Sequence, residues 1–381
     1  MTTQAQTAGP VNTVLMASLA GLVVSLGVAL AMLMGQGHAA FNTGSDGVSW
    51  GLPVAAYVFF AITSTGLTLV ASLAMVFGVK AFYPVAKRCV LLAGASLIGG
   101  MACLALEVGH VFRMAWALPF SFQIVSAMWW MGVLYALDLV FMALKFQRVN
   151  AGDWDSPASR FYGVASMVFA VAATATLGLV FGMMAMRPFW FGDLIPISFI
   201  VMGAVSGIAV ATLAAYLAYG SQDQMPEKVR ELLTGALPKV FAAVLGLALV
   251  MVAARTITGL WSNADGLEAF DWMVAAPWFW IEIAALVVAF YILLSPGLRG
   301  TANMQVAASL LVLAALFIGR YEYVVGGQVV PLFKGAWVPQ FIDYTPSLTE
   351  WMLALLALSL TFGIYALGEK MFNLGAAPEK S

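Results

Sequence analysis

The chain has 381 residues, of which 62% are hydrophobic and only 9% are charged, and its net charge is −1. Soluble domains carry about 25% charged residues, so this composition excludes a soluble globular protein and indicates an integral membrane protein. The sequence also contains no run of basic residues of the kind that binds nucleic acid.

Ten apolar segments are long enough to cross a bilayer, since roughly 20 residues at about 1.5 Å each span the hydrocarbon core. They are residues 14–34, 54–78, 89–111, 122–145, 161–186, 196–219, 238–258, 274–294, 303–320 and 349–368, the ninth being the shortest. The first is too long for a signal peptide, and we expect it to be retained. The fold class predicted is an all-α integral membrane protein with one polytopic membrane domain over residues 1–381.

The distribution of Lys and Arg predicts the topology, because these residues concentrate in cytoplasmic loops. With the N-terminus inside, the inner side holds Lys80, Lys87, Arg88, Lys145, Arg148, Arg160, Lys228, Arg230, Lys239, Arg299, Lys370 and Lys380. The outer side holds only Arg113, Arg187, Arg255, Arg320 and Lys334. We therefore expect a bacterial inner-membrane protein with both termini in the cytoplasm.

Weak internal similarity suggests a repeat. The second and sixth segments each have a Pro near the outer end and a Gly further along, and Trp129-Trp130 of the fourth segment match Phe279-Trp280 of the eighth. These matches predict two four-helix bundles, from segments two to five (54–186) and six to nine (196–320). Segments one (14–34) and ten (349–368) would be additions. Chance similarity among apolar helices is the alternative.

Redox centres bound by the chain itself are not expected. Its only cysteines are Cys89 and Cys103, and its only histidines are His38 and His110. Two cysteines are too few for a four-thiolate iron–sulfur cluster, and a membrane b-type haem normally needs paired axial histidines. The sequence predicts no haem, no iron–sulfur cluster and no metal site.

The stretch LEVGHVFRMAW, residues 106–116, places Glu107, His110 and Arg113 at i, i+3 and i+6. On a helix this spacing puts all three on roughly one face. They lie where the third apolar segment meets the outer water. Ionisable groups are costly in lipid, so a functional site is the default hypothesis.

A quinone site fits this position. A quinone needs an apolar slot for its tail, donors for its two ring oxygens and a group that carries protons. We expect Glu107 and His110 to carry protons, and Tyr57 and Gln123 to donate to a quinone carbonyl. Arg113 would position them or meet a partner protein. An interfacial belt accounts for most of the aromatic residues nearby.

Four charged residues within the segments are candidates for a proton path: Asp138, Arg255, Glu282 and Arg320. Glu282 either pairs with a cation such as Arg255 or relays protons. Asp138 either is a buried acid held by hydroxyl groups or lines an inward water path with Tyr135 and hydroxyl residues of the second segment. Arg113, Arg255 and Arg320 at the outer ends of segments either extend to the lipid headgroups or share one polar pocket with Glu107, His110 and Glu282. Glu322 belongs to the same outer set of polar residues.

The order and spacing of several motifs resemble the NrfD-like, polysulfide-reductase membrane-subunit family. They are WGLPVAAYVFFAITSTG (50–66), TLGLVFGMMAMRPFWFGDLIPISFIVMGAVSG (176–207), FWIE (279–282) and GRYEYVVGGQ (319–328). The resemblance covers segments two to nine. Ten spans are similar to the longer branch, which includes membrane subunits of a periplasmic hydrogenase and of alternative complex III.

The resemblance implies a haem-free subunit that binds a quinone or quinol, either menaquinone or ubiquinone. It also implies a ferredoxin-like iron–sulfur partner on the periplasmic face, with a molybdopterin or other catalytic subunit beyond it. A His expected within the fifth segment of relatives is missing here, where Ala173, Thr174, Ala175 and Thr176 stand. A proton route through that His would be altered or absent.

The leading hypothesis is a quinone-binding membrane anchor subunit of a respiratory iron–sulfur oxidoreductase. The catalytic centre would belong to a partner, and electrons would pass between the quinone and the iron–sulfur subunit. Proton translocation through the path above is a second role. The rival from another class is a secondary transporter with an internal repeat and midplane acids as its site.

Overall fold

The computed structural model describes residues 8–44, 47–262, 264–333, 335 and 337–378, and helices are the only regular secondary structure in them. Ten helices are long and apolar enough to cross a membrane, which confirms the predicted all-α membrane fold. They are α1 Ala8–Gln36, α2 Leu52–Met75, α3 Tyr83–Glu107, α5 Ala127–Asn150, α6 Pro157–Gly182, α7 Ile195–Tyr219, α9 Ala236–Trp261, α11 Pro277–Leu294, α13 Ala302–Val329 and α14 Leu348–Met371.

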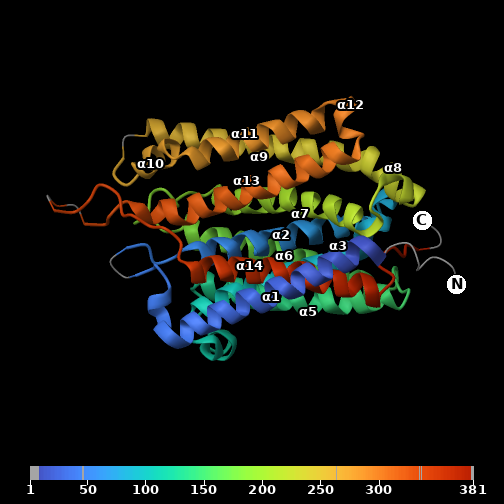
Figure 1. Cartoon of the computed structure of the whole chain (residues 1–381), viewed down its shortest axis with the longest axis horizontal. Helices are drawn as coiled ribbons and strands as arrows, with labels where there is room; N and C mark the ends of the chain where they lie inside the picture. The colour runs from blue at the N-terminus through green and yellow to red at the C-terminus, as the bar shows by residue number, and fades with distance from the viewer. Residues whose placement is uncertain (1–7, 45–46, 263, 334, 336, 379–381) are drawn as a thin grey trace.

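The long helices run side by side, and α1 begins at the same end of the molecule at which α14 ends (Figure 1). We call this end the termini side and the other end the opposite side. Short helices connect the long ones: η1 Gly37–Ala40, η2 Lys80–Phe82, η3 Arg113–Ala117, α4 Leu118–Phe120, η4 Gln222–Gln224, α8 Glu227–Thr234, α10 Ala269–Ala275 and α12 Pro296–Arg299. Of the counted cations, Lys334 and Lys380 lie outside the described residues.

Two predicted boundaries are wrong for physical reasons. The ninth segment is not the shortest, because α13 continues to Val329. Its hydropathy falls at Arg320 and Glu322, but both side chains are buried against protein. The fourth helix begins at Ala127 rather than at 122, because the chain before it forms an irregular connection from the end of α3.

Helix α2 lies at the centre of the molecule, and most of its residues are buried. It packs against α3, α6, α7, α13 and α14. The contact with α7 is close because Gly66 faces Gly203 and Gly207, and a Cβ at Gly66 or Gly207 would overlap the backbone of the other helix. Small residues four apart allow such an approach between membrane helices.

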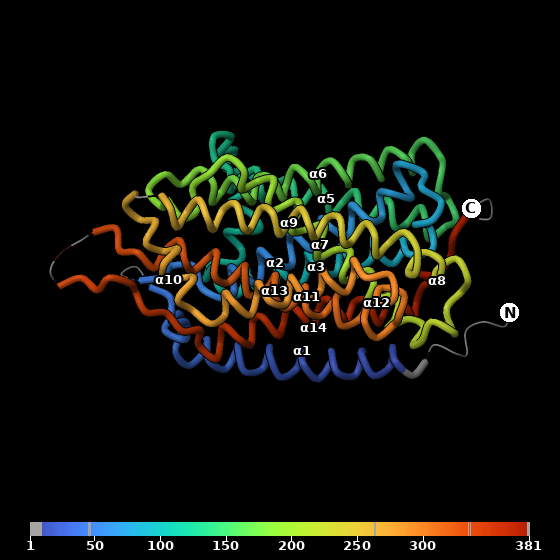
Figure 2. Tube along the Cα trace, turned by 90° about the horizontal axis from the view of Figure 1, so that it is seen from above, coloured from blue at the N-terminus to red at the C-terminus, as the bar shows by residue number. Residues whose placement is uncertain are grey.

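The remaining helices surround this pair. Helices α2, α3, α5 and α6 contact one another in a closed ring, and so do α7, α9, α11 and α13. Helix α14 packs against α3, and α1 covers α14 at the edge of the molecule opposite α5 and α6 (Figure 2). The internal repeat and the division at 54–186 and 196–320 stay predictions, because contacts between helices do not test a repeat of sequence.

A buried cation joins three helices on the termini side. Arg88 of α3 is 4% exposed and forms an ion pair with Glu369 of α14, with 2.5 Å between Nε and Oε1. Its Nη1 donates to the hydroxyl of Tyr219 at the end of α7, at 2.9 Å. The neighbouring Lys87 donates to Asn150 at the end of α5, at 2.9 Å. Cations counted as loop charges therefore hold helix ends together.

Replacing Arg88 with Met should destabilise the protein by about 3–5 kcal/mol, because Glu369 would stay buried without its partner. Thermal unfolding of the protein in detergent measures this loss. Arg148→Met is the control, since its pair with Asp153 is exposed and spans 3.5 Å. Equal melting temperatures for both variants would contradict the assignment.

Replacing Gly207 with Leu should force α2 and α7 apart and cost at least about 1–3 kcal/mol, the usual effect of overpacking. The yield of monodisperse protein and its melting temperature report this. Gly27→Leu on α1 is the matched control, because a Cβ there meets nothing within 4 Å. A Gly207→Leu protein as stable as the control would refute the close contact.

Candidate functional site

A cavity of about 810 Å³ lies on the opposite side, within the ring of α2, α3, α5 and α6. Its wall is formed by the start of α2, the end of α3, the start of α5 and the end of α6, together with η1, η3 and α4. Most of the lining is apolar, including Val54, Val58, Met101, Leu104, Met128, Trp129, Met131, Val133, Leu177, Val180 and Phe181. Ligand sites of this kind are largely apolar with a few placed polar groups.

The cavity owes its outer wall to the way α3 ends. The helix stops at Glu107, and Gly109 follows in the left-handed region with φ +74°. A residue in that conformation ends a helix, and Gly adopts it without steric cost. The chain then forms one π-helical turn, Arg113–Ala117, before the short α4.

This geometry makes one prediction wrong. Glu107, His110 and Arg113 do not share a helix face, because α3 ends before His110 and Gly109 redirects the chain. The Gly in LEVGH was the local signal for this end. Helical spacing applies only where the helix continues, and here it does not.

Three of the five predicted quinone residues nevertheless line the cavity. They are Tyr57, Glu107 and Arg113. In the part of the chain that the structure describes, His110 and Gln123 lie outside the lining, and both are exposed. The fold thus brings Tyr57 of α2 to the same cavity as Glu107 and Arg113. His110 and Gln123, which are close to Glu107 and Arg113 in sequence, lie at the surface instead.

Two polar groups of the lining lack strong partners. Tyr57 is 2% exposed, and its hydroxyl contacts only the sulfur of Met131, at 3.5 Å. Glu107 Oε2 is buried and makes no hydrogen bond to any described residue. A buried polar atom without a partner is costly, so each such atom in a native protein needs an explanation.

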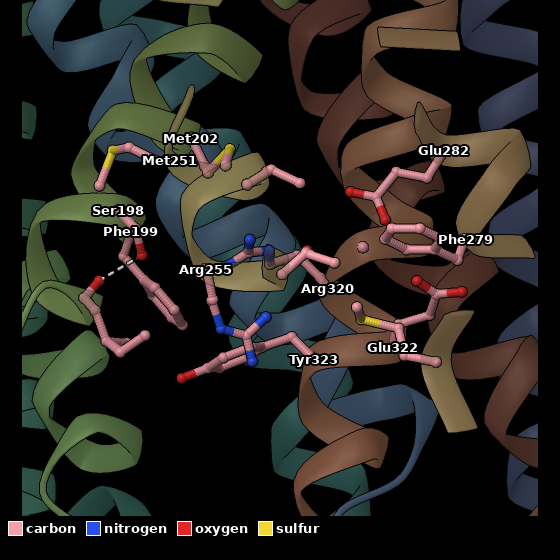
Figure 3. Close-up of a pocket in the computed structure, with 15 residues that line it drawn as sticks. Ser198, Phe199, Met202, Met251, Arg255, Phe279, Glu282, Arg320, Glu322 and Tyr323 are labelled. Carbon is pink, nitrogen blue, oxygen red and sulfur yellow. Dashed lines mark hydrogen bonds between the residues drawn. The ribbon is translucent and has the colours of Figure 1, made fainter. Parts of the chain in front are cut away.

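A second, smaller cavity of about 60 Å³ lies between α7, α9, α11 and α13 (Figure 3). It brings together Arg255 of α9, Glu282 of α11, and Arg320 and Glu322 of α13. The carboxyl group of Glu282 packs directly over Gly319, where a side chain would collide with it. Arg255 and Arg320 thus share one pocket with Glu282, whereas Arg113 and Glu107 line the large cavity instead.

Aromatic rings surround the two guanidinium groups. Arg255 lies 4.4 Å from the ring centre of Phe189 and 4.8 Å from that of Tyr323, and Arg320 lies 4.9 Å from that of Phe199. No ion pair within 4.0 Å joins either arginine to a described carboxylate. Arg320 Nε and both oxygens of Glu322 are buried without described hydrogen-bond partners.

Three hydroxyl groups form a hydrogen-bonded chain next to the large cavity, towards the termini side. The hydroxyl of Tyr135 on α5 lies 3.0 Å from Thr174 Oγ1 on α6, which lies 2.7 Å from Thr65 Oγ1 on α2. All three side chains are fully buried. Thr174 is one of the residues that stand where relatives were expected to carry a His.

Asp138 lies one turn further along α5, towards the termini side. Ser166 Oγ donates to its Oδ1 at 2.8 Å, whereas its Oδ2 has no hydrogen-bond partner among the described residues. A void of about 10 Å³ beside Ser166 is lined by Thr68 and Lys145. Lys145 is 1% exposed and donates to Ser159 Oγ at 2.8 Å. The Ser166 bond fits a structural acid, and the free Oδ2 fits a water path.

Sequence reasoning missed two residues that the structure brings to these sites. His38 lines the large cavity, and Lys145 lines the void next to Ser166, the hydrogen-bond partner of Asp138. His38 and Lys145 belong to no pattern of sequence spacing that could have identified them.

Among the described residues, no group of three His, Cys, Asp or Glu side chains is arranged to hold a metal ion.

Outside the spans, Tyr344 fixes the connection between α13 and α14 over the start of α2. Its hydroxyl donates to Glu350 Oε1 at 2.8 Å and accepts the N–H of Leu52 at 2.8 Å. Burial, together with the neighbouring Glu350, raises the pKa of Tyr344 well above its usual value. The group stays neutral and acts as a structural donor.

Comparison with known proteins identifies the family. The model of the polysulphide reductase NrfD family matches residues 40–331. The chain belongs to the NrfD family. The match begins at the last residue of η1 and ends just beyond α13, so it leaves out α1 and α14. It includes the lining of both cavities except His38.

Three relatives extend the comparison over most of the chain. A subunit of the selenate reductase of Mesobacillus selenatarsenatis is 24% identical over 80% of this chain and 80% of its own. The Hdr-like menaquinol oxidoreductase integral membrane subunit of Archaeoglobus fulgidus is 23% identical over 88% and 87%, respectively. A putative membrane subunit of the dimethyl sulfoxide reductase of Halobacterium salinarum is 24% identical over 93% and 88%. All three are named as subunits of reductases or oxidoreductases.

Proposed function

We propose that this NrfD-family protein is the quinone- or quinol-binding membrane anchor of a respiratory iron–sulfur oxidoreductase. The observation that carries the proposal is the large apolar cavity with the unpartnered Glu107 carboxyl group in its wall. A relative named as a subunit of a menaquinol oxidoreductase supports it. Membership of this family favours an oxidoreductase subunit over a secondary transporter.

The residues present fit a quinone. The volume of about 810 Å³ is in the range of small-molecule sites, and its apolar side chains suit an isoprenoid tail. Quinone chemistry is the transfer of two electrons and two protons at the ring oxygens. The Tyr57 hydroxyl and the Arg113 guanidinium are the donors to a ring oxygen, and Glu107 Oε2 gains its missing partner when the head group binds.

In this proposal Glu107 is the proton carrier of the site. His110, the second predicted carrier, and Gln123, the second predicted donor, lie on the exposed connection between α3 and α5. Their roles stay predictions, and ligand-induced movement of that connection is the only way for them to reach the cavity. The head group would face the opposite side, where α3 ends and α5 begins.

The proposed orientation places the termini side in the cytoplasm and the opposite side in the periplasm of a bacterial inner membrane. The excess of Lys and Arg on the termini side supports it. A ferredoxin-like iron–sulfur subunit would then lie on the opposite side, within electron-transfer reach of the cavity. A catalytic subunit, with molybdopterin or another centre, would lie beyond it.

Glu107→Gln should lower quinol-linked electron transfer by about 10²–10⁴-fold, the usual contribution of a proton-transferring group. The measurement is turnover of the purified complex with a soluble quinol analogue. Binding of the analogue should change little, since Gln keeps the shape. Glu231→Gln, an exposed acid of α8, is the matched control. Normal turnover in Glu107→Gln would remove Glu107 from the mechanism.

A specific observation favours proton translocation as a second role. Tyr135, Thr174 and Thr65 connect by short hydrogen bonds, and Asp138 below them has one unpartnered oxygen. We propose that Asp138 is the inner acid of a path from the cytoplasm. Glu282, Arg255 and Arg320 would form a separate polar site in the second ring of helices, α7, α9, α11 and α13.

Asp138→Asn should reduce the number of protons moved per electron while leaving electron transfer largely intact, because the amide cannot carry a proton. The complex in liposomes, with a pH-sensitive dye, measures this ratio. Asp223→Asn, an exposed acid on the termini side, is the control. An unchanged ratio in Asp138→Asn would exclude this acid from the path.

A further inference from the structure

We propose that His38, rather than His110, is the imidazole that exchanges protons between the quinone cavity and the outer water. The inference rests on the proposed quinone site and names a residue of that site which neither sequence pattern nor family membership assigns. His38 lies in η1, directly after α1, and the family match begins only at residue 40. The imidazole is therefore supplied by the helix that precedes the family region.

The position of His38 is the first argument. Its side chain is part of the cavity wall, and the residue is also exposed at the surface of the chain. A proton carrier at a cavity mouth needs both contacts, because it must meet the bound group and bulk water in turn. Glu107 lines the same cavity, but its Oε2 is buried, so it needs such a neighbour to exchange protons with water.

The turn after α3 also supports the assignment, because it packs directly against His38. Gly109 lies two residues beyond Glu107, and a side chain at Gly109 would overlap the His38 ring at Nε2. The left-handed conformation of Gly109, φ +74°, lets the backbone pass beneath the imidazole. His38 thus packs against the segment that carries Glu107, and Gly109 of the LEVGH motif leaves room for its imidazole ring.

The unused hydrogen-bonding capacity of the ring is the third argument. Its one aromatic neighbour is Phe41, with ring centres 5.8 Å apart. Neither imidazole nitrogen bonds to a described residue, and only the backbone carbonyl of His38 accepts a bond, from the N–H of Phe41. The ring therefore keeps hydrogen-bonding capacity that no described residue uses, although Nε2 lies against the backbone of Gly109.

The charged surroundings suit a group that gains and loses a proton. The titratable and charged side chains that share the cavity wall with His38 are Tyr57 from α2, Glu107 from α3 and Arg113 from η3. The described walls of α5 and α6 contribute apolar side chains only. The wall therefore places one carboxyl group, that of Glu107, in the same cavity as the imidazole, where it can serve as the partner for proton exchange.

The proton balance follows from the proposed electron transfer. For each quinol oxidised, two electrons leave towards the iron–sulfur partner and two protons leave the ring oxygens. Each proton passes to the Glu107 carboxylate, then to the His38 imidazole, and then to outer water. In the reducing direction the same residues act in reverse order.

The test compares two histidines in the assembled complex with a quinol analogue as donor. His38→Gln should lower turnover near pH 7 by about 10²-fold or more and change the shape of the pH profile of turnover. His110→Gln is the matched control and should stay within about twofold of wild type. In His38→Ala, imidazole added to the buffer should restore turnover, which a merely structural role would not allow.

Binding of the quinone analogue distinguishes a failure of the proposed function from a failure of the His38 assignment. If wild-type protein binds no quinone analogue, the proposed function fails. If the analogue binds and His38→Gln keeps the wild-type turnover and pH profile, only the assignment of His38 is overturned. A large loss confined to His110→Gln overturns it as well and returns the role to His110. Equal melting temperatures of the variants exclude misfolding as the cause.

Discussion

Every ionisable side chain placed within the spans must be enclosed by protein, because hydrocarbon offers it no partner. The molecule meets this constraint in two ways. On the termini side, Arg88 has a carboxylate, a hydroxyl and an aromatic ring as partners, and it joins helix ends. On the opposite side, Glu107, Arg320 and Glu322 have buried atoms next to cavities that form no hydrogen bond to a described residue. One set of charges stabilises the fold, and the other is available for chemistry.

The central pair of helices makes this division possible. Because Gly66, Gly203 and Gly207 let α2 and α7 approach closely, each of the two rings of helices can enclose its own cavity on either side of the pair. The larger cavity is apolar and suits a quinone, whereas the smaller has two guanidinium and two carboxyl groups. The proposed electron transfer and the proposed Asp138 proton path would therefore share the first ring, and Glu282, Arg255 and Arg320 would form a separate polar site in the second.

The first helix has a different place in this scheme. It lies outside the region that matches the family and packs on α14 rather than in either ring. Yet the residues that follow it, His38 to Thr43, complete the wall of the large cavity. Residues at the edge of the family match thus contribute side chains to a cavity that helices of the family region enclose.

The sequence by itself determined the membrane fold, the ten spans and the family, because hydropathy over about 20 residues is a local property. It also singled out Tyr57, Glu107 and Arg113, which line one cavity, since charged or polar groups near span ends stand out against an apolar background. The end of α3 had a local signal in Gly109, but the continuation of α13 through Arg320 could not be predicted, because it depends on the protein that buries this side chain. Only the tertiary structure placed His38 beside Glu107, as their separation of about 70 residues leaves no trace in local spacing.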